Sequence, residues 1–555
     1  MLPVLPKQTL SMQTRDRTRL DADIYYPDAE GEFPVLLMRQ PYGRAIASTV
    51  VYAHPSWYAA HGYIVVIQDV RGRGSSAGDF TLFANEIEDG YDAVEWAAQL
   101  PRSTGQVGMY GFSYQGMTQL YAAAAKPPSL QTICPSMVAY DLYSDWAYEG
   151  GAFCYQNNLS WACQLAAETA RRRGDAAAYQ ALYNAARTPN TSDPVCPRSE
   201  LLERLAPDSF YHDWLANPDP NADYWHRLSP KTYLNDVDLP MLHIGGWFDT
   251  HLRGTWNLFK AIARRSQFPQ HLWVGPWAHL PWGRKAGIVD FGAAANSPID
   301  RLQVRWFDQC LKGQDTGLFE EAPICLFEMG TNQWRRFDQL PPSPTHHFFL
   351  QGSGLASMSD RAGELVAERS PNSPAIDTFV HDPWRPVPHV GGHAAVPTGM
   401  SDRAALDTRT DILTYTSSPL PTGLFIAGEI TVELYCTADA PSFDLCATLS
   451  QVSPDGSVLN FSQGYLRISS PAPPRSHTLC LQPTCIHIPA GHCLRLSISA
   501  ASSPAYVVNP GTGSQPQESQ LIEARVIAVS VYSGGTFASR VRLSLVAAGD
   551  RYTDG

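Results

Sequence analysis

Short apolar runs alternate with segments of helical periodicity through the first part of the chain. Alternating apolar and polar positions at 20–27 and continuous apolar runs at 33–39, 63–69 and 106–110 predict strands. Residues 86–99 place their apolar side chains on one helical face and predict a helix. Strands that alternate with helices favour a mostly parallel sheet, so this region is predicted to be an α/β fold.

The pattern changes at about residue 142, where runs typical of buried strands disappear. Alanine, tyrosine and tryptophan dominate, and residues 161–173 and 175–187 have helical periodicity. The next run typical of a buried strand begins at residue 239. A helical segment between two parts of one sheet is typical of an inserted cap, which we expect to lie over an active site.

Short segments of alternating hydrophobicity dominate the last two fifths of the chain. Residues 430–436, 446–452 and 494–499 are examples, and turn residues separate such segments regularly. This pattern predicts an all-β sandwich. The polar, proline-rich stretch at 363–409 is expected to be an ordered linker that crosses between domains. The expected units are the first part of the α/β domain (1–141), the helical cap (142–236), the second part of the α/β domain (237–340) and the C-terminal β domain (341–555).

Composition narrows the class of partner. The 555 residues carry 41 basic and 53 acidic side chains, a formal net charge of -12. This balance argues against nucleic acid or an anionic membrane as partner, and no apolar run is long enough to span a bilayer. The eleven cysteines form no paired motif, which favours reduced thiols. With no recognisable signal peptide, the expectation is a cytoplasmic protein that acts on a small molecule.

The most informative motif is GFSYQG at residues 111–116, a Gly-x-Ser-x-Gly pattern with one extra residue before the last glycine. It lies between the strand predicted at 106–110 and an alanine-rich helix predicted at 117–126. A serine on a tight strand-to-helix turn is held above the sheet, and the helix N-terminus favours negative charge there. Ser113 is therefore the candidate nucleophile of a serine hydrolase.

A serine nucleophile needs a histidine base and a carboxylate that orients it. Asp249 ends an apolar run at 239–248 and is the candidate acid, although it is also placed to cap a following helix predicted at 250–259. His279 follows the run at 271–278 and is the candidate base. The order serine, aspartate, histidine is that of α/β-hydrolases.

Several motifs spread over nearly the whole chain resemble one family. They are RQPY at 39–42, DVRGRGSSAG at 69–78, GFSY at 111–114, GWFD at 246–249, GPWAH at 275–279, RWFD at 305–308, DPWRPVP at 382–388 and RTDIL at 409–413. In this order they resemble the X-Pro dipeptidyl-peptidase and cocaine-esterase group of serine hydrolases, which includes α-amino-acid ester hydrolases and glutaryl-cephalosporin acylases.

The resemblance implies an α/β-hydrolase fold with an inserted helical cap and a C-terminal jelly-roll-like β domain. It implies Ser113, Asp249 and His279 as catalytic triad, with no metal or organic cofactor. It also implies an oxyanion hole formed by the Tyr42 hydroxyl and the Tyr114 backbone N–H, a role that suits a preorganised donor. The residues expected to line the substrate site are Trp146, Tyr148, Phe248 and His251.

The sequence leaves the reaction partly open. Family members that prefer a free α-amino group carry acidic residues after the catalytic aspartate, where this chain has Thr250, His251 and Leu252. Asp145 and Glu149 are candidates to replace them. We therefore expect a serine esterase or amidase with an apolar acyl site. The alternatives are acyl transfer to an amine or alcohol, X-Pro dipeptidyl-peptidase activity and a non-catalytic binding protein. A homodimer is a further possibility.

Overall fold

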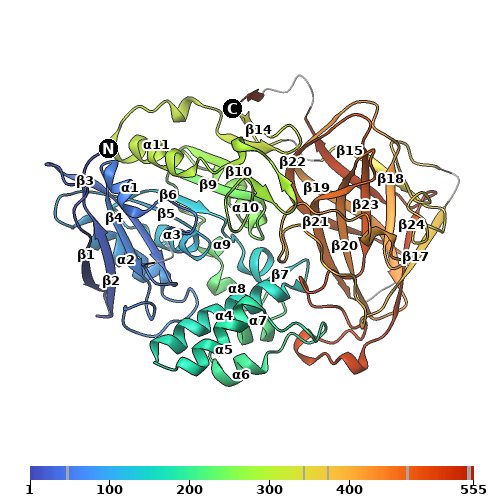
Figure 1. The fold of residues 1–555 in the computed structure, drawn as a ribbon, viewed down its shortest axis with the longest axis horizontal. Coiled ribbons are helices and arrows are strands. Elements are labelled where there is room, and N and C mark those ends of the chain that lie inside the picture. Colours follow the sequence, from blue (N-terminus) through green and yellow to red (C-terminus); the bar gives the residue numbers. More distant parts are fainter. Residues whose placement is uncertain (46–48, 342–343, 372–373, 470–473, 547–551, 555) are drawn as a thin grey trace.

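The computed structural model describes the chain except residues 46–48, 342–343, 372–373, 470–473, 547–551 and 555. It has a sheet flanked by helices on one side of the view in Figure 1, a β domain on the other and a helical segment along the lower edge. This is the predicted class, an α/β-hydrolase fold with a helical insertion and a C-terminal β domain.

The central sheet has eleven strands among the described residues, in the order β1-β2-β4-β3-β5-β6-β9-β10-β13-β14-β26. The strands from β4 to β13 in this order are parallel, and antiparallel strands extend both edges. Their interior is buried on both faces, which explains the continuous apolar runs of the sequence. The strands are β1 (Gln8–Gln13), β2 (Arg19–Tyr25), β3 (Phe33–Gln40), β4 (Ile64–Asp69), β5 (Ser103–Phe112), β6 (Leu130–Ser136), β9 (Met241–Phe248), β10 (Gln270–Ala278), β13 (Ile324–Glu328), β14 (Gln333–Phe337) and β26 (Tyr552–Asp554).

Helices cover this sheet. They are α1 (Pro55–Ala60), α2 (Glu86–Ala98), α3 (Tyr114–Ala124), α10 (Leu252–Ala263) and α11 (Ile299–Lys312). The helix predicted at 117–126 begins three residues earlier, at Tyr114, because the turn is confined to Ser113. The helix predicted at 250–259 begins at Leu252 and runs to Ala263. Short elements follow β10, namely β11 (Lys285–Ala286), β12 (Val289–Asp290), η3 (Ala293–Ala295) and η4 (Leu318–Glu320).

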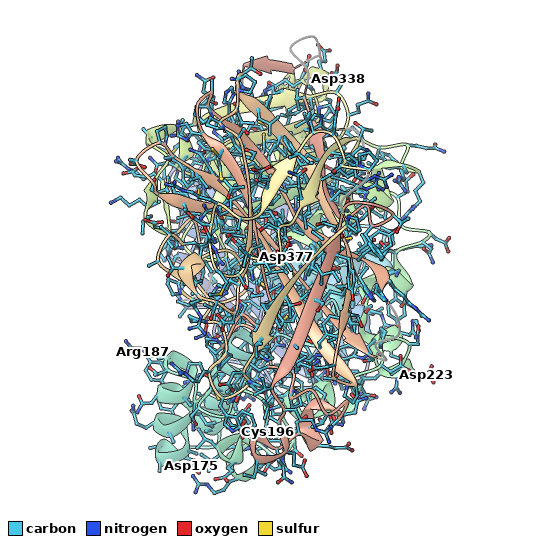
Figure 2. All side chains as sticks on the ribbon, turned by 90° about the vertical axis from the view of Figure 1, so that its right-hand side faces the viewer. Asp175, Arg187, Cys196, Asp223, Asp338 and Asp377 are labelled. Atoms are coloured by element: carbon cyan, nitrogen blue, oxygen red, sulfur yellow. The ribbon has the colours of Figure 1, made fainter. Side chains whose placement is uncertain are left out.

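The segment between β6 and β9 is helical, and its helices lie along the lower edge of the molecule (Figure 1). Figure 2 shows the same helices projecting below the β domain, with Asp175 and Arg187 at their surface. The elements are η2, a π-helix (Tyr143–Ala147), the hairpin β7 (Tyr148–Glu149) and β8 (Ala152–Phe153), and the helices α4 (Tyr155–Arg172), α5 (Ala176–Arg187), α6 (Glu200–Leu205), α7 (Phe210–Ala216), α8 (Asp223–Leu228) and α9 (Pro230–Tyr233). Helix α4 begins six residues before the predicted stretch at 161–173.

The C-terminal domain is built from mostly antiparallel strands around its own apolar core. They are β15 (His346–Gln351), β16 (Glu364–Val366), β17 (Ala375–His381), β18 (Leu413–Ser417), β19 (Leu424–Ala438), β20 (Ser442–Val452), β21 (Val458–Ser469), β22 (Arg475–Ile488), β23 (Cys493–Ser499), β24 (Ile527–Ser533) and β25 (Arg540–Leu545). Three short 3-10 helices, η5 (Leu406–Thr408), η6 (Pro516–Glu518) and η7 (Leu521–Glu523), complete it.

The segment predicted as a linker, 363–409, is not free of strands. It contains β16 and β17, and β17 pairs with β24 over its whole length. The buried face of β17 carries the polar side chains of Asp377 and His381, whereas Ile376 and Val380 are exposed. Phe379 shares the buried face, but the two polar side chains there and the two apolar ones outside blur the alternation that marks a strand in the sequence. The exact limits of the four expected units stay a prediction.

Candidate active site

The strand β5 leads directly into a strained turn at Ser113. The backbone of Ser113 has φ 58° and ψ -128°, and α3 begins at the next residue. Its N–H donates to the carbonyl of Ser136 in β6 over 2.9 Å. A non-glycine residue at positive φ is strained and persists only where its surroundings require it. The turn thus holds the serine hydroxyl at the carboxyl edge of the parallel strands.

The glycines around Ser113 let strand and helix approach each other. A Cβ atom on Gly111 would lie 2.5 Å from the Cβ of Gln115. One on Gly116 would lie 2.4 Å from Cγ1 of Val138. The extra residue in the motif does not disturb the turn, because Gly116 makes its close contact from within α3.

Asp249 and His279 lie side by side at the same edge of the sheet. They follow β9 and β10, which are parallel neighbours, and Nδ1 of His279 lies 2.7 Å from Oδ1 of Asp249. Asp249 is fully buried, whereas 29% of the His279 side chain is exposed. A buried carboxylate at Nδ1 fixes the tautomer that leaves Nε2 free to accept a proton. The ring of Phe112, next to Ser113, lies 5.4 Å from the His279 ring.

Tyr42 lies against the serine. Its hydroxyl is close enough to the Ser113 side chain to interact with it, and it accepts the indole N–H of Trp161 over 3.1 Å. Burial raises the pKa of Tyr42 to about 12, so the phenol keeps its proton and can donate it to a developing oxyanion. The backbone N–H of Tyr114 belongs to the first turn of α3, where N–H groups have no acceptor within the helix.

Packed aromatic rings connect Tyr42 with His279, the candidate base. Trp161 packs on Trp146 with ring centroids 4.8 Å apart, and Trp146 packs on His251 at 4.1 Å. The His251 ring in turn lies 5.2 Å from that of His279. Burial lowers the pKa of His251 to about 4, so the ring is neutral at physiological pH. Trp146 and His251, which were expected to contact substrate, therefore form an uncharged aromatic surface beside the candidate triad.

Two other expected substrate residues have different surroundings. Tyr148 stacks on Tyr143 and donates its hydroxyl to the carbonyl of Trp214 over 2.9 Å, inside the helical segment. Phe248 is buried and stacks on Phe291, within the apolar cluster shared with the C-terminal domain. Both side chains thus have packing roles, and their contact with substrate stays a prediction. Trp161 was not among the residues expected at the site, because the helical periodicity of the sequence does not show which face of α4 meets Tyr42.

The acidic candidates for binding an ammonium group are already engaged. Glu149 is buried, with Oε1 2.7 Å from Nη1 of Arg253 and Oε2 3.0 Å from Nε2 of His393. Oδ2 of Asp145 accepts the backbone N–H groups of Tyr140 and Asp141 over 3.1 and 2.7 Å. A carboxylate whose acceptor positions are occupied by protein donors is a poor partner for an amino group of a substrate.

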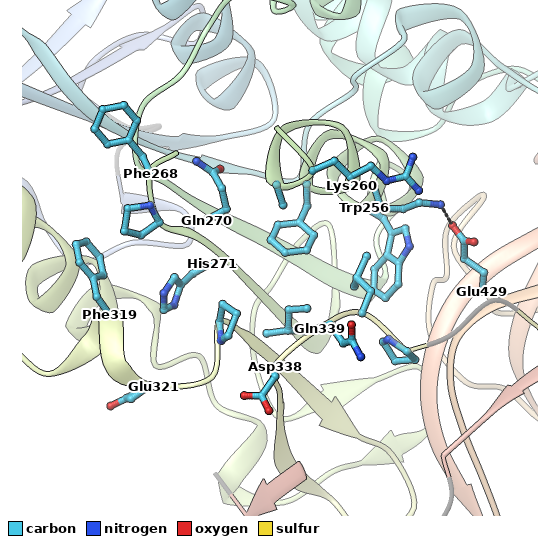
Figure 3. A pocket seen from close by; sticks show the side chains of 18 residues that line it. Trp256, Lys260, Phe268, Gln270, His271, Phe319, Glu321, Asp338, Gln339 and Glu429 are labelled. Carbon is cyan, nitrogen blue, oxygen red and sulfur yellow. Dashed lines mark hydrogen bonds and ion pairs between the residues drawn. The ribbon is translucent and has the colours of Figure 1, made fainter. Parts of the chain in front are cut away.

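A cavity of about 740 Å³ lies away from this site, between α10, the start of β10 and the segment 338–341, with Glu429 of the C-terminal domain at its edge. Figure 3 shows Trp256 and Phe268 on its walls and an ion pair of Lys260 with Glu429 at its rim. No triad residue lines it. Within the described parts of the chain, no three or more potential metal-ligating side chains cluster together, and no helix combines the length and hydrophobicity of a membrane span.

Comparisons with known proteins agree with this geometry. Residues 16–281 match the family X-Pro dipeptidyl-peptidase (S15 family), and residues 317–542 match the X-Pro dipeptidyl-peptidase C-terminal non-catalytic domain. The chain is 30% identical to the cocaine esterase of Rhodococcus sp. (strain MB1 Bresler), over 96% of this chain and 97% of the relative.

Solved structures share the whole fold. An aminopeptidase from a marine sediment Thaumarchaeota archaeon superimposes with a TM-score of 0.82 at 21% identity, covering 98% of this chain and 96% of that one. An α-amino acid ester hydrolase gives a TM-score of 0.78 at 21% identity, with 98% and 97% covered. The family matches and the 30% identity to the cocaine esterase show that the chain belongs to the X-Pro dipeptidyl-peptidase (S15) and cocaine-esterase family of serine hydrolases.

Proposed function

We propose that this serine hydrolase cleaves esters of apolar acyl groups through an acyl-enzyme on Ser113. The observation that carries the assignment is the 2.7 Å contact of His279 with the buried Asp249, at the edge of the sheet where β5 presents Ser113. Among the described residues, no other pair of a histidine and a carboxylate follows two parallel, neighbouring strands of the sheet that carries Ser113.

The proposed reaction has two steps. The Ser113 hydroxyl attacks the carbonyl carbon while Nε2 of His279 takes its proton, and the carbonyl oxygen becomes an oxyanion held by the Tyr42 hydroxyl and the Tyr114 N–H. His279 then protonates the departing alcohol, and the acyl group stays on the serine. Water, deprotonated by His279, then attacks this ester, the bond between the acyl carbon and the Ser113 oxygen breaks, and the acid leaves. His279 returns its proton to the Ser113 oxygen, which restores the hydroxyl.

The aromatic residues next to the triad favour a substrate ester whose acyl group is uncharged. Trp146, Trp161 and His251 are aromatic and neutral, and Glu149 and Asp145 are engaged with protein donors. X-Pro dipeptidyl-peptidase activity is the alternative within the family, but it requires an anionic partner for the free amino terminus of the peptide. Acyl transfer uses the same acyl-enzyme and differs only in the final acceptor.

Single-turnover kinetics test the proposal. The wild type should release a burst of p-nitrophenol from p-nitrophenyl acyl esters, and Ser113→Ala should release none. Ser160→Ala is a matched control, because its hydroxyl donates to the carbonyl of Ala186 in the helical segment. A burst that persists in Ser113→Ala would overturn the assignment. Cleavage of Gly-Pro p-nitroanilide in preference to every ester would favour the peptidase, and ester products formed with added alcohol would indicate acyl transfer.

We further propose that the protein works in a reducing compartment such as the cytoplasm. Its eleven cysteines are all free thiols, and most of them are buried. Such thiols persist where the redox environment keeps them reduced. Cell fractionation followed by thiol labelling of the denatured protein tests this proposal, with eleven labelled cysteines expected.

A further inference from the structure

A second cavity, of about 1030 Å³, lies between the loop that follows β4 and the helical segment. The loop contributes Arg73 and Phe80, and the helices contribute Leu165 and Thr169 of α4 and Phe210 of α7. We call it the cap cavity. Phe210 packs on Trp161 with ring centroids 4.8 Å apart, and Trp161 is hydrogen-bonded to Tyr42. The cap cavity is therefore separated from Tyr42 by the packed rings of Phe210 and Trp161.

The feature that distinguishes this cavity is a buried cation, Arg73, which is 2% exposed. Its Nη1 donates to the carbonyl of Leu165 over 2.9 Å and to the hydroxyl of Thr169 over 3.0 Å. Its Nε has no acceptor within the described part of the chain. The guanidinium carbon lies 3.6 Å from the centroid of the Phe80 ring. These partners are neutral, and none compensates the positive charge.

The nearby charges leave Arg73 without a counter-ion. No ion pair among the described residues includes it, although carboxylates pair with most other buried arginines here. Glu168 is close enough to influence it but forms a 2.7 Å pair with Arg171. Arg172 repels it and donates to the carbonyls of Gly74 and Ser76. Burial lowers the pKa of Arg73 to about 10, so it stays charged at neutral pH.

The remaining charged side chains of the cavity lie at its rim, where Arg172 is half-buried and the others are exposed. They are Asp79, Arg172, Arg173, Asp175, Asp208, Asp213 and Arg227. The rim thus carries four carboxylates and three arginines, whereas the buried interior holds one uncompensated cation. Leaving a charge buried and unpaired is costly, and a planar guanidinium prefers a carboxylate as partner. An anion that enters the cavity would therefore gain more at Arg73 than at any rim position.

We propose that the cap cavity binds a small organic carboxylate, with Arg73 as its counter-charge and Phe80 as an apolar surface beneath the ion pair. We expect the carboxylate to belong to a separate molecule, because the acyl group proposed for the triad is apolar and no triad residue lines the cavity. A carboxylate on the substrate itself is the alternative outcome that the test distinguishes. The binding itself does not depend on the reaction proposed for Ser113, so the two proposals can fail separately.

Calorimetric titration of Ser113→Ala with benzoate and with neutral benzamide tests the binding without turnover. Benzoate should bind at least about tenfold more tightly, the range of a charge-assisted hydrogen bond. Arg73→Met should remove this difference, and Arg73→Lys should keep part of it. Arg173→Met, which removes the same charge from the exposed rim, should change benzoate affinity by less than about twofold. Circular dichroism establishes that each variant is folded.

A pair of substrates identifies the source of the carboxylate. If it belongs to the substrate, kcat/KM for p-nitrophenyl hemisuccinate should exceed that for p-nitrophenyl butyrate by about tenfold, and Arg73→Met should abolish the preference. If it belongs to a separate molecule, hemisuccinate has no advantage and benzoate does not compete with butyrate. Equal binding of benzoate and benzamide, or a benzoate affinity unchanged in both Arg73 variants, would overturn the proposal.

Discussion

Gln482, in β22 of the C-terminal domain, donates its side-chain N–H to the backbone carbonyl of Asp249 over 3.0 Å. This bond joins the proposed catalytic acid to the domain whose matching family is described as non-catalytic. Gln482 is 1% exposed, so water does not replace the bond easily. The C-terminal domain thus helps to hold the turn that positions Asp249 against His279.

Replacement of Gln482 by leucine should lower kcat by about tenfold and leave KM within about twofold, because a small displacement of Asp249 misplaces the base. Steady-state kinetics with a p-nitrophenyl ester measure both constants. Gln463→Leu is the matched control, since Gln463 is also buried in this domain but bonds to Ser502. Equal losses of activity in the two variants would mean that Gln482 acts only through stability.

The Tyr42 hydroxyl should contribute directly to the transition state. Tyr42→Phe removes one oxyanion donor and should lower kcat by about 10²–10³-fold with little change in folding. Tyr52→Phe also removes a hydroxyl, one that donates to Ser136 over 3.0 Å, and should retain most activity. A Tyr42→Phe enzyme with wild-type kcat would show that the oxyanion is held elsewhere.

The buried Glu149 connects three parts of the molecule, because its partners are Arg253 on α10 and His393 and Tyr506 in the C-terminal domain. Glu149→Gln leaves Arg253 uncompensated and should lower the free energy of unfolding by about 3–5 kcal/mol. Chemical denaturation measures the change.

The control for this variant is Glu203→Gln. Glu203 pairs with Arg198 at the surface, where both side chains are more than one third exposed. Such a pair should contribute less than about 1 kcal/mol. If Glu149→Gln is as stable as the control, the cluster is not a stabilising junction.

Buried histidines should make the protein sensitive to acid. Burial lowers the pKa of His243, His251 and His271 to about 4 and that of His389 to about 3, from an ordinary value of 6.5. Between these values the unfolded chain binds protons that the folded chain does not, so stability is full above pH 6.5 and is lost as the pH falls towards 4. Each group should contribute about 1.4 kcal/mol per pH unit in this window.

Thermal unfolding between pH 7.5 and 4.5 measures this slope. His243→Gln should reduce the pH slope of the stability by about 1.4 kcal/mol per pH unit, the contribution of one buried histidine. His243 is buried beside Gln270. Exposed His226→Gln should leave the slope unchanged. A pH slope that is identical in all three proteins would contradict the assignment to buried histidines.

Local sequence signals predicted the strand–turn–helix geometry around Ser113 well. The Gly-x-Ser motif and its flanking periodicity predicted both the turn at Ser113 and a strand and a helix on either side. The helix begins at Tyr114 rather than at residue 117. Hydrophobic periodicity does not reveal a first helical turn that contains polar residues. β17 was predicted as linker for a similar reason, since the polar side chains on its buried face conceal a backbone that is fully paired.

Local patterns along the chain predicted the alternating strands and helices of the α/β domain and the positions of Ser113, Asp249 and His279 after three apolar runs, because hydrophobic period and glycine placement are local properties. The surroundings of these three residues follow only from the packing of the folded chain. The bonds of Tyr42 with Trp161 and of Asp249 with Gln482 join residues 119 and 233 positions apart. The neutral partners of Arg73 likewise come from a distant helix. Such contacts depend on which faces pack together, and the order of residues along the chain does not specify that.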